Sequence, residues 1–247
     1  IDESLLRKSS RGTYDREVIA FGTGVGAHGE KNFTISTDQF SMYDIENGVS
    51  AMISGELGLT DEGNAQAIAS ALVREAAKVA GLSVVKATGG EKFVRELIAN
   101  ALTRKVAIKD PDAFCDELVS LDAFLHWFDE PMSERRPDLL RIRASIVNGY
   151  FEITLQLIEC KLAGKSEGYL EKAREQIESG LRELVGKFKP RNSLEPDDYG
   201  RSDQRYWWMQ LHRLVSTHGS TTKAKYGETL AALERLGEGL FAVDWQA

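Results

Sequence analysis

The chain has 247 residues, which is enough for one large domain or two small ones with a packed core. Hydrophobic residues make up 42% of it and charged residues 28%, the ordinary balance of a globular protein. The formal net charge of −7 argues against a protein that holds nucleic acid by bulk electrostatics, although it leaves room for a local basic surface.

Cysteine usage and hydropathy indicate the cellular compartment of the protein. No apolar run reaches the ~18 residues that a membrane-spanning helix needs, and the start does not resemble a signal peptide. We therefore expect a cytoplasmic protein with no membrane partner. Cys115 and Cys160 lack the spacing of zinc ligands, and a disulfide framework is not expected. Because the chain begins at Ile1 without an initiator methionine, we interpret it as part of a longer polypeptide.

The first 60 residues are expected to be β-rich, with short strands at EVIAF (17–21) and NFTIST (32–37). The stretch between them contains Gly24-x-Gly26-x-x-Gly29, which formally matches the dinucleotide-binding fingerprint. That fingerprint requires a helix directly after it, whose amides hold the pyrophosphate, whereas a strand pattern follows here. A tight glycine-rich turn between two strands is the favoured interpretation.

Further along, apolar spacing predicts helices over Asn64–Ala80, Glu91–Arg104 and Ser166–Phe188. A short SVVKA run (83–87) lies between the first two. Residues 109–136 show no single pattern, and 189–204 form a polar loop. RYWWMQLHRLV (205–215) is predicted to be a helix with a buried aromatic side, and GLFAVDW (239–245) a closing strand.

A β-hairpin is predicted over 138–161, because Asn148-Gly149 stands between two strand patterns and suits a type I′ turn. A two-residue loop fixes the register, and a slip of one residue would exchange the two faces. The pairs expected on the apolar face are Ile146–Phe151, Ala144–Ile153, Ile142–Leu155 and Leu140–Leu157. The pairs expected on the polar face are Ser145–Glu152, Arg143–Thr154 and Arg141–Gln156.

The next pair on the apolar face would set Asp138 opposite Glu159, with Lys161 two residues further along the same face. Opposed residues have Cβ atoms ~5 Å apart, and like charges there destabilise the hairpin. Two such carboxylates lower this cost by sharing a proton or by binding a cation. The sequence therefore predicts a small site for Mg²⁺ or Mn²⁺, which bind through one or two carboxylates together with waters and substrate phosphate.

Pro137-Asp138 followed by Glu159-Cys160-Lys161 resembles the PD-(D/E)xK nuclease superfamily. The segments RPDLLRI, LIECKL and RYWWMQLHRL extend the likeness, over roughly residues 90–247, to nuclease domains attached to FtsK- or HerA-type DNA-translocating ATPases of bacterial defence systems. The resemblance implies an α/β fold over 61–247, with a restriction-endonuclease-like mixed central sheet flanked by helices. Residues 1–60 would then be a junction with a neighbouring domain.

The same resemblance implies a Mg²⁺-dependent deoxyribonuclease with DNA as substrate, an ATPase or translocase domain or subunit as partner, and a role in antiphage defence. Asp138, Glu159 and the carbonyl of Cys160 would hold the metal, and Lys161 would position the attacking water. Gln176 in the following helix would orient the lysine or contact a phosphate. Further phosphate contacts are expected from Arg135, Arg136 and Lys165.

Two features of the family pattern are not met by the sequence. The family supplies another acid from its first core helix, but Glu75 only flanks the apolar stripe of one helix and Glu96 points away from that of the next. RecB-like members carry a tyrosine four residues after the glutamine, where this chain has Gly180. An inactive nuclease-like module that docks or positions DNA therefore stays open as an alternative, as does a purely structural Asp–Lys–Glu cluster.

Overall fold

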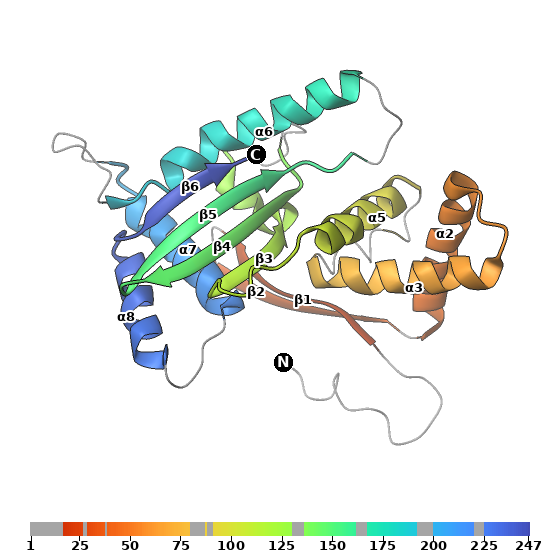
Figure 1. Cartoon of the computed structure of the whole chain (residues 1–247), viewed down its shortest axis with the longest axis horizontal. Coiled ribbons are helices and arrows are strands. Elements are labelled where there is room, and N and C mark those ends of the chain that lie inside the picture. Colours follow the sequence, from red (N-terminus) through yellow and green to blue (C-terminus); the bar gives the residue numbers. More distant parts are fainter. Residues whose placement is uncertain are drawn as a thin grey trace. The chain divides into compact units, whose positions relative to one another are not determined.

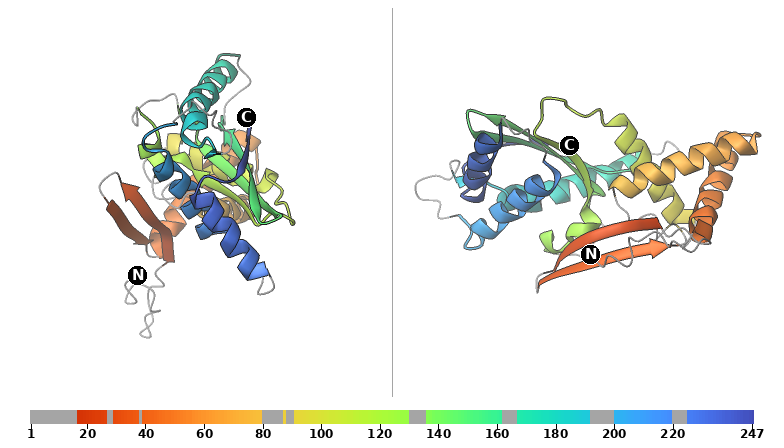
Figure 2. Two further views of the ribbon diagram at one scale, coloured as in Figure 1. Left: turned by 90° about the vertical axis from the view of Figure 1, so that its left-hand side faces the viewer. Right: turned by 90° about the horizontal axis from the view of Figure 1, so that it is seen from below.

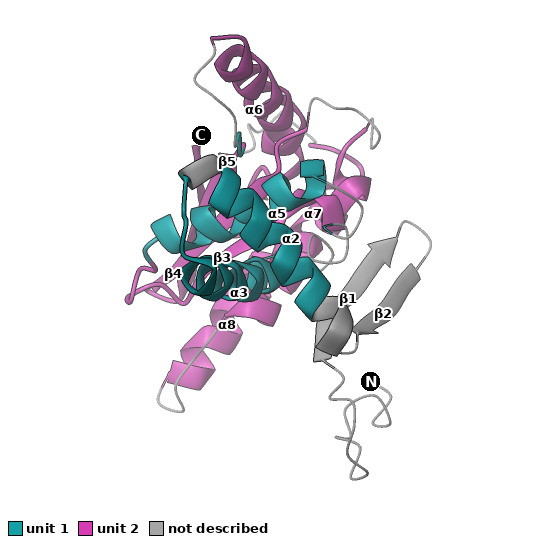
Figure 3. Cartoon of the chain, turned by 90° about the vertical axis from the view of Figure 1, so that its right-hand side faces the viewer, with its two compact units in different colours: residues 1–108, 160–164 teal, residues 109–159, 165–247 magenta. Residues whose placement is uncertain are grey.

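The computed structural model describes residues 17–26, 29–37, 39–79, 87, 91–129, 136–161, 167–191, 200–219 and 225–247. The chain divides into two compact units (Figure 3). Unit 1 comprises residues 1–108 and 160–164, and unit 2 comprises 109–159 and 165–247. Within the described residues, no helix combines the length and the apolar character needed to cross a membrane.

Unit 1 consists of a β-hairpin and three helices. The two strands and two of the helices were expected, although the tip of the glycine-rich turn, residues 27–28, lies outside the described residues, as do residues 83–86 of the SVVKA run. The elements are β1 (Glu17–Gly26), β2 (Gly29–Thr37), α2 (Gln39–Leu57), α3 (Glu62–Val79) and α5 (Glu91–Val106). The two strands pair antiparallel.

Helix α2 corrects the expectation that the first 60 residues are β-rich throughout. Ile45, Val49 and Ile53 recur every four residues and are buried, so they form the stripe of an amphipathic helix. This stripe packs with Leu72 of α3 and Leu97 of α5 in one core. Because the three helices share that core, α3 and α5 belong with α2 in unit 1, although the sequence placed them in the 61–247 domain.

Unit 2 is an α/β assembly built on a four-stranded mixed sheet in the order β3-β4-β5-β6. The first three strands pair antiparallel, and β6 pairs parallel to β5. Figures 1 and 2 show α6, α7 and α8 packed along this sheet. The elements are β3 (Cys115–Ser120), the 3₁₀ segment η2 (Leu121–Trp127), β4 (Leu139–Val147), β5 (Tyr150–Ile158), α6 (Glu167–Lys187), α7 (Gln204–His218), α8 (Tyr226–Gly237) and β6 (Ala242–Gln246).

The predicted register of the hairpin is confirmed. Asn148 and Gly149 form the turn with φ of 52° and 76°, and Val147 pairs with Tyr150. The seven pairs predicted from Leu140–Leu157 to Ile146–Phe151 are present. The ladder continues to Leu139–Ile158 and ends before the predicted Asp138–Glu159 pair. The mixed sheet flanked by helices is thus confirmed for unit 2, whereas the restriction-endonuclease-like fold itself stays a prediction.

One face of the hairpin forms the core of unit 2. Ile142 and Leu155 on this face are fully buried and pack with Leu184 of α6 and Leu211 of α7. The apolar stripe that residue spacing predicts for the helix over 166–188 begins at Leu170, but this prediction is wrong, because Leu170 is 68% exposed near the start of α6. The sequence also did not predict β3, η2 or α8. Charged residues interrupt β3, and η2 is too short and irregular to show a period.

Candidate functional site

The open end of the hairpin brings two of the predicted acids together. Asp138 directly precedes β4, and Glu159 directly follows β5. The backbone N–H of Asp138 donates a hydrogen bond of 3.1 Å to Oε2 of Glu159. Both residues are partly buried. The Glu159 carboxylate therefore reaches across to the partner strand at the point where the register sets Asp138.

Cys160 and Lys161 are the next two residues of the chain, and they belong to unit 1. Cys160 is partly buried, and its Sγ lies 3.2 Å from Oγ1 of Thr103 in α5 of the same unit. Lys161 is exposed. Lys161 therefore follows Glu159 with one residue between them.

Gln176 lies on α6 and is 6% exposed. Its Nε2 donates a hydrogen bond of 3.0 Å to the backbone carbonyl of Arg136, two residues before Asp138. A buried side-chain amide that holds a carbonyl fixes the course of the backbone at that point. The structure thus gives Gln176 a contact that the sequence did not predict, with the segment that leads into β4.

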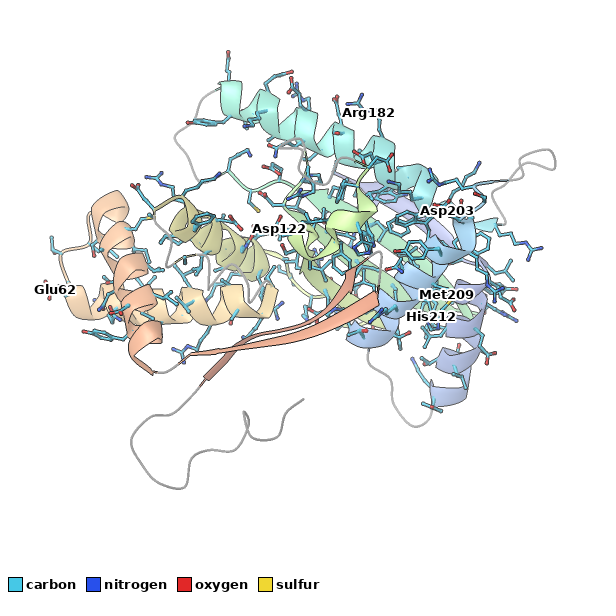
Figure 4. The ribbon with its side chains drawn as sticks, turned by 180° about the vertical axis from the view of Figure 1, so that it is seen from behind. Glu62, Asp122, Arg182, Asp203, Met209 and His212 are labelled. Atoms are coloured by element: carbon cyan, nitrogen blue, oxygen red, sulfur yellow. The ribbon has the colours of Figure 1, made fainter. Side chains whose placement is uncertain are left out.

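Arg136, which the sequence offered as a phosphate contact, forms an ion pair within unit 2. Its Nη2 donates to Oδ1 of Asp122 at 2.7 Å, and its guanidinium lies 5.9 Å from the centroid of the Phe128 ring. The side chain is 19% exposed. Asp122 comes from η2 and is labelled in Figure 4. Arg135 and Lys165, the other expected phosphate contacts, lie outside the described residues.

Arg141, on the polar face of β4, is also engaged inside unit 2. Its Nε and Nη2 donate to the two carboxylate oxygens of Asp116, each at 2.8 Å, and the backbone N–H of Asp110 donates to the same carboxylate. Burial raises the pKa of Asp116, but the hydrogen bonds from Arg141 and Asp110 outweigh it, so the pKa lies below its usual value. This bidentate pair stabilises the contact between β3 and β4.

The acid that the family would supply from a first core helix has no counterpart that we can assign among the described residues. Glu75 of α3 accepts hydrogen bonds from Lys78 and Arg104 of unit 1, and its pKa is lowered, chiefly by the bond from Lys78. No group of three or more His, Cys, Asp or Glu side chains suited to a metal occurs among the described residues. The acid pair nevertheless fits Mg²⁺, which binds through as few as one or two carboxylates and keeps several waters.

Gly180 is a further residue of the site, and the sequence did not assign it a role. A Cβ at this position would lie 2.8 Å from Cγ of Pro137 and 3.0 Å from Cδ1 of Leu157. Helix α6 therefore approaches the open end of the hairpin as closely as a glycine allows. A tyrosine, which RecB-like members carry at this position, would not fit here. The clue in the sequence is a glycine within the apolar stripe of a helix.

Comparison with known proteins adds no assignment: no family model, no curated protein and no solved structure matches this chain. The geometry at the open end of the hairpin is therefore the basis for a functional proposal.

Proposed function

We propose that this chain is a Mg²⁺- or Mn²⁺-dependent nuclease that hydrolyses phosphodiester bonds in DNA at the open end of the β4–β5 hairpin. The observation that supports the proposal is the 3.1 Å hydrogen bond from the Asp138 N–H to Glu159, at the position that the predicted register gives. The register also sets Asp138 opposite Glu159, and carboxylates on opposed residues repel each other unless a proton or a cation lies between them.

Each residue of the proposed site has a distinct task. Asp138 and Glu159 would bind the metal, together with the backbone carbonyl of Cys160. When bound, such a metal supplies a water of lowered pKa and neutralises charge on the scissile phosphate. Lys161 would hold the attacking water and stabilise the negative charge that develops on the phosphate. Leu140 and Leu157 are fully buried on the same face and keep the acids next to an apolar surface, where charge interactions are strong.

The wider context of the proposal comes from the sequence resemblance. The segments that resemble nuclease domains of DNA-translocating ATPases suggest an ATPase domain or subunit as partner and a role in antiphage defence. In this proposal Arg136 has a structural role in the site, because its guanidinium is paired with Asp122.

The first test is cleavage of plasmid and linear DNA with and without Mg²⁺ or Mn²⁺. We expect cleavage only with the metal, and a loss of about a hundredfold or more in Lys161→Ala, because the lysine acts on the developing charge. Lys105→Ala is the matched control, since Lys105 is also an exposed lysine of unit 1. A folded Lys161→Ala protein that cuts as fast as the wild type would show that the lysine is not catalytic.

The second test detects metal binding through the thermal stability of the protein. A ligand that binds only the folded protein stabilises it by RT ln(1 + [L]/Kd), about 2.7 kcal/mol at a hundredfold excess over Kd. Mn²⁺ should therefore raise the Tm of the wild type and raise that of Asp138→Asn much less. The substitution keeps the backbone N–H that donates to Glu159. Equal shifts in the two proteins would place the ion elsewhere.

A nuclease-like module without catalysis is the second candidate. It is favoured by the pairing of Glu75 with Lys78 and Arg104, and by the lack of a third acid near the hairpin end among the described residues. Such a module would bind DNA in a filter or gel-shift assay and would leave it intact at every metal concentration. The cleavage assay separates the two candidates.

A further inference from the structure

The three residues that lead into β4, Arg136-Pro137-Asp138, lie beyond the last pair of the β4–β5 ladder, which is Leu139–Ile158. Strand pairing with β5 therefore does not extend to them, and hydrogen bonds with η2, α6 and Glu159 hold them in place. Since Asp138 is one of the two acids of the proposed site, whatever holds this segment also sets the geometry of the acid pair.

The first set of contacts comes from η2 and its N-terminal cap. The N–H of Leu121 donates to the carbonyl of Asp138 at 2.9 Å. The next residue, Asp122, holds the guanidinium of Arg136 through its Oδ1 at 2.7 Å. The N–H of Asp122 is itself held by Oγ of Ser120, the N-cap residue of η2.

The second set comes from α6. Gln176 donates to the carbonyl of Arg136 at 3.0 Å, and Gly180 lets the helix pack closely on Pro137. Arg136 is thus held at both ends: η2 binds its side chain and α6 binds its backbone. Ion pairs with this degree of burial resist screening by solvent better than fully exposed pairs do.

The C-terminal end of η2 is also hydrogen-bonded to α6. Nζ of Lys187, a residue only 2% exposed, donates to the carbonyl of Trp127 and to Oδ1 of Asp129, each at 2.7 Å. The same ammonium lies 5.3 Å from the centroid of the Trp207 ring on α7. Hydrogen bonds therefore hold η2 at both of its ends.

We propose that Asp122 is a positioning residue for Asp138, acting through Arg136. It fixes the backbone of residues 136–138, so that the Asp138 N–H stays on Glu159 and the two acids keep one spacing. Asp122 is not itself a ligand, because its carboxylate binds Arg136 and, among the described residues, it forms no group of three potential ligands with the acid pair. The consequence for the metal rests on the proposed function, whereas the effect on the backbone does not.

The experiment compares the wild type with Asp122→Ala by amide hydrogen exchange and by Mn²⁺ titration. In Asp122→Ala the Asp138 amide should exchange at least tenfold faster, while the amides of Ile142 and Leu155 in the middle of the hairpin keep their rates. The Kd for Mn²⁺ should rise about tenfold, the lower end of the effect of residues that orient metal ligands. Asp122→Glu, which retains the carboxylate, should restore most of both properties.

Glu171→Ala is the matched control, because it removes a carboxylate that pairs with Arg174 on α6, at 3.5 Å and on the surface. Glu171→Ala should change neither the exchange rate of the Asp138 amide nor the Kd for Mn²⁺. An Asp138 amide that keeps its exchange rate in Asp122→Ala would overturn the proposal, and so would an equal acceleration of all amides in unit 2. If the wild type neither binds Mn²⁺ nor cuts DNA, the proposed function fails, and the exchange rates alone decide the role of Asp122.

Discussion

The two ends of the β4–β5 hairpin are held in different ways. At the turn, Asn148 and Gly149 adopt positive φ, and two residues suffice to join the strands. At the open end, the ladder stops at Leu139–Ile158, and the last residues before β4 are held by η2 and α6. Short-range chemistry thus determines the register, while contacts between segments distant in the sequence determine the geometry of the acids.

The largest effect is expected from filling the space at the open end. In Gly180→Ala the new methyl would meet Pro137 and Leu157 at 2.8 to 3.0 Å, so α6 or the hairpin end must shift. Overpacking of this kind costs about 1–3 kcal/mol, which exceeds the gain in helix propensity. Urea denaturation of the variant and of the wild type measures the difference.

Gly186→Ala is the matched control for this substitution, because Gly186 lies on the same helix in open space. Outside its own stretch of helix, no atom would lie within 4 Å of a Cβ at this position. The substitution should stabilise the protein by up to about 1 kcal/mol, through helix propensity alone. If both alanines stabilise equally, the close approach of α6 to the hairpin end does not matter for stability.

These contacts also explain what the sequence could and could not predict. The register followed from Asn148-Gly149 and from alternation along two strands, because both signals are local and strong. The partner of Arg136 could not be predicted, since Asp122 lies in a segment without periodicity and pairs with it only through the folded chain. The same holds for the bond from Gln176 to the Arg136 carbonyl, because the sequence resemblance suggested Lys161 or a phosphate as the partner of this residue.

In unit 1, helix α2 is likewise an element that the sequence did not predict. The stripe Ile45, Val49 and Ile53 is visible in the sequence, but Gly48 and Gly55 lie within the helix and weaken its pattern. Packing with α3 and α5 outweighs that weak propensity, and α2 forms.

In unit 2, the register predicted Asp138 and Glu159 as neighbours. The hydrogen bond from the backbone N–H of Asp138 to the carboxylate of Glu159 was not predicted.

The turn end should tolerate substitution better than Gly180 does. Gly149 has a φ of 76°, which strains any residue with a Cβ, so Gly149→Ala should lose about 1–2 kcal/mol. Its Cβ would meet only Nη1 of Arg235, at an ordinary 3.5 Å, so strain and not collision is the cause. Gly149→Asn should recover part of the loss, because asparagine adopts positive φ more readily. Equal losses in both variants would contradict this explanation.

The smallest effect is expected from removing the contact of Arg235 with the turn. The Arg235 guanidinium of α8 lies 4.2 Å from the centroid of the Tyr150 ring, and its Nη1 reaches the Gly149 carbonyl at 3.4 Å. Arg235→Gln should lose about 0.5–1 kcal/mol, the range of a cation–π contact at a partly exposed site. Hydrogen exchange should rise at Tyr150 and stay unchanged at Asp138. Faster exchange at Asp138 would mean that the turn also supports the acids, and that the two ends of the hairpin are not held independently.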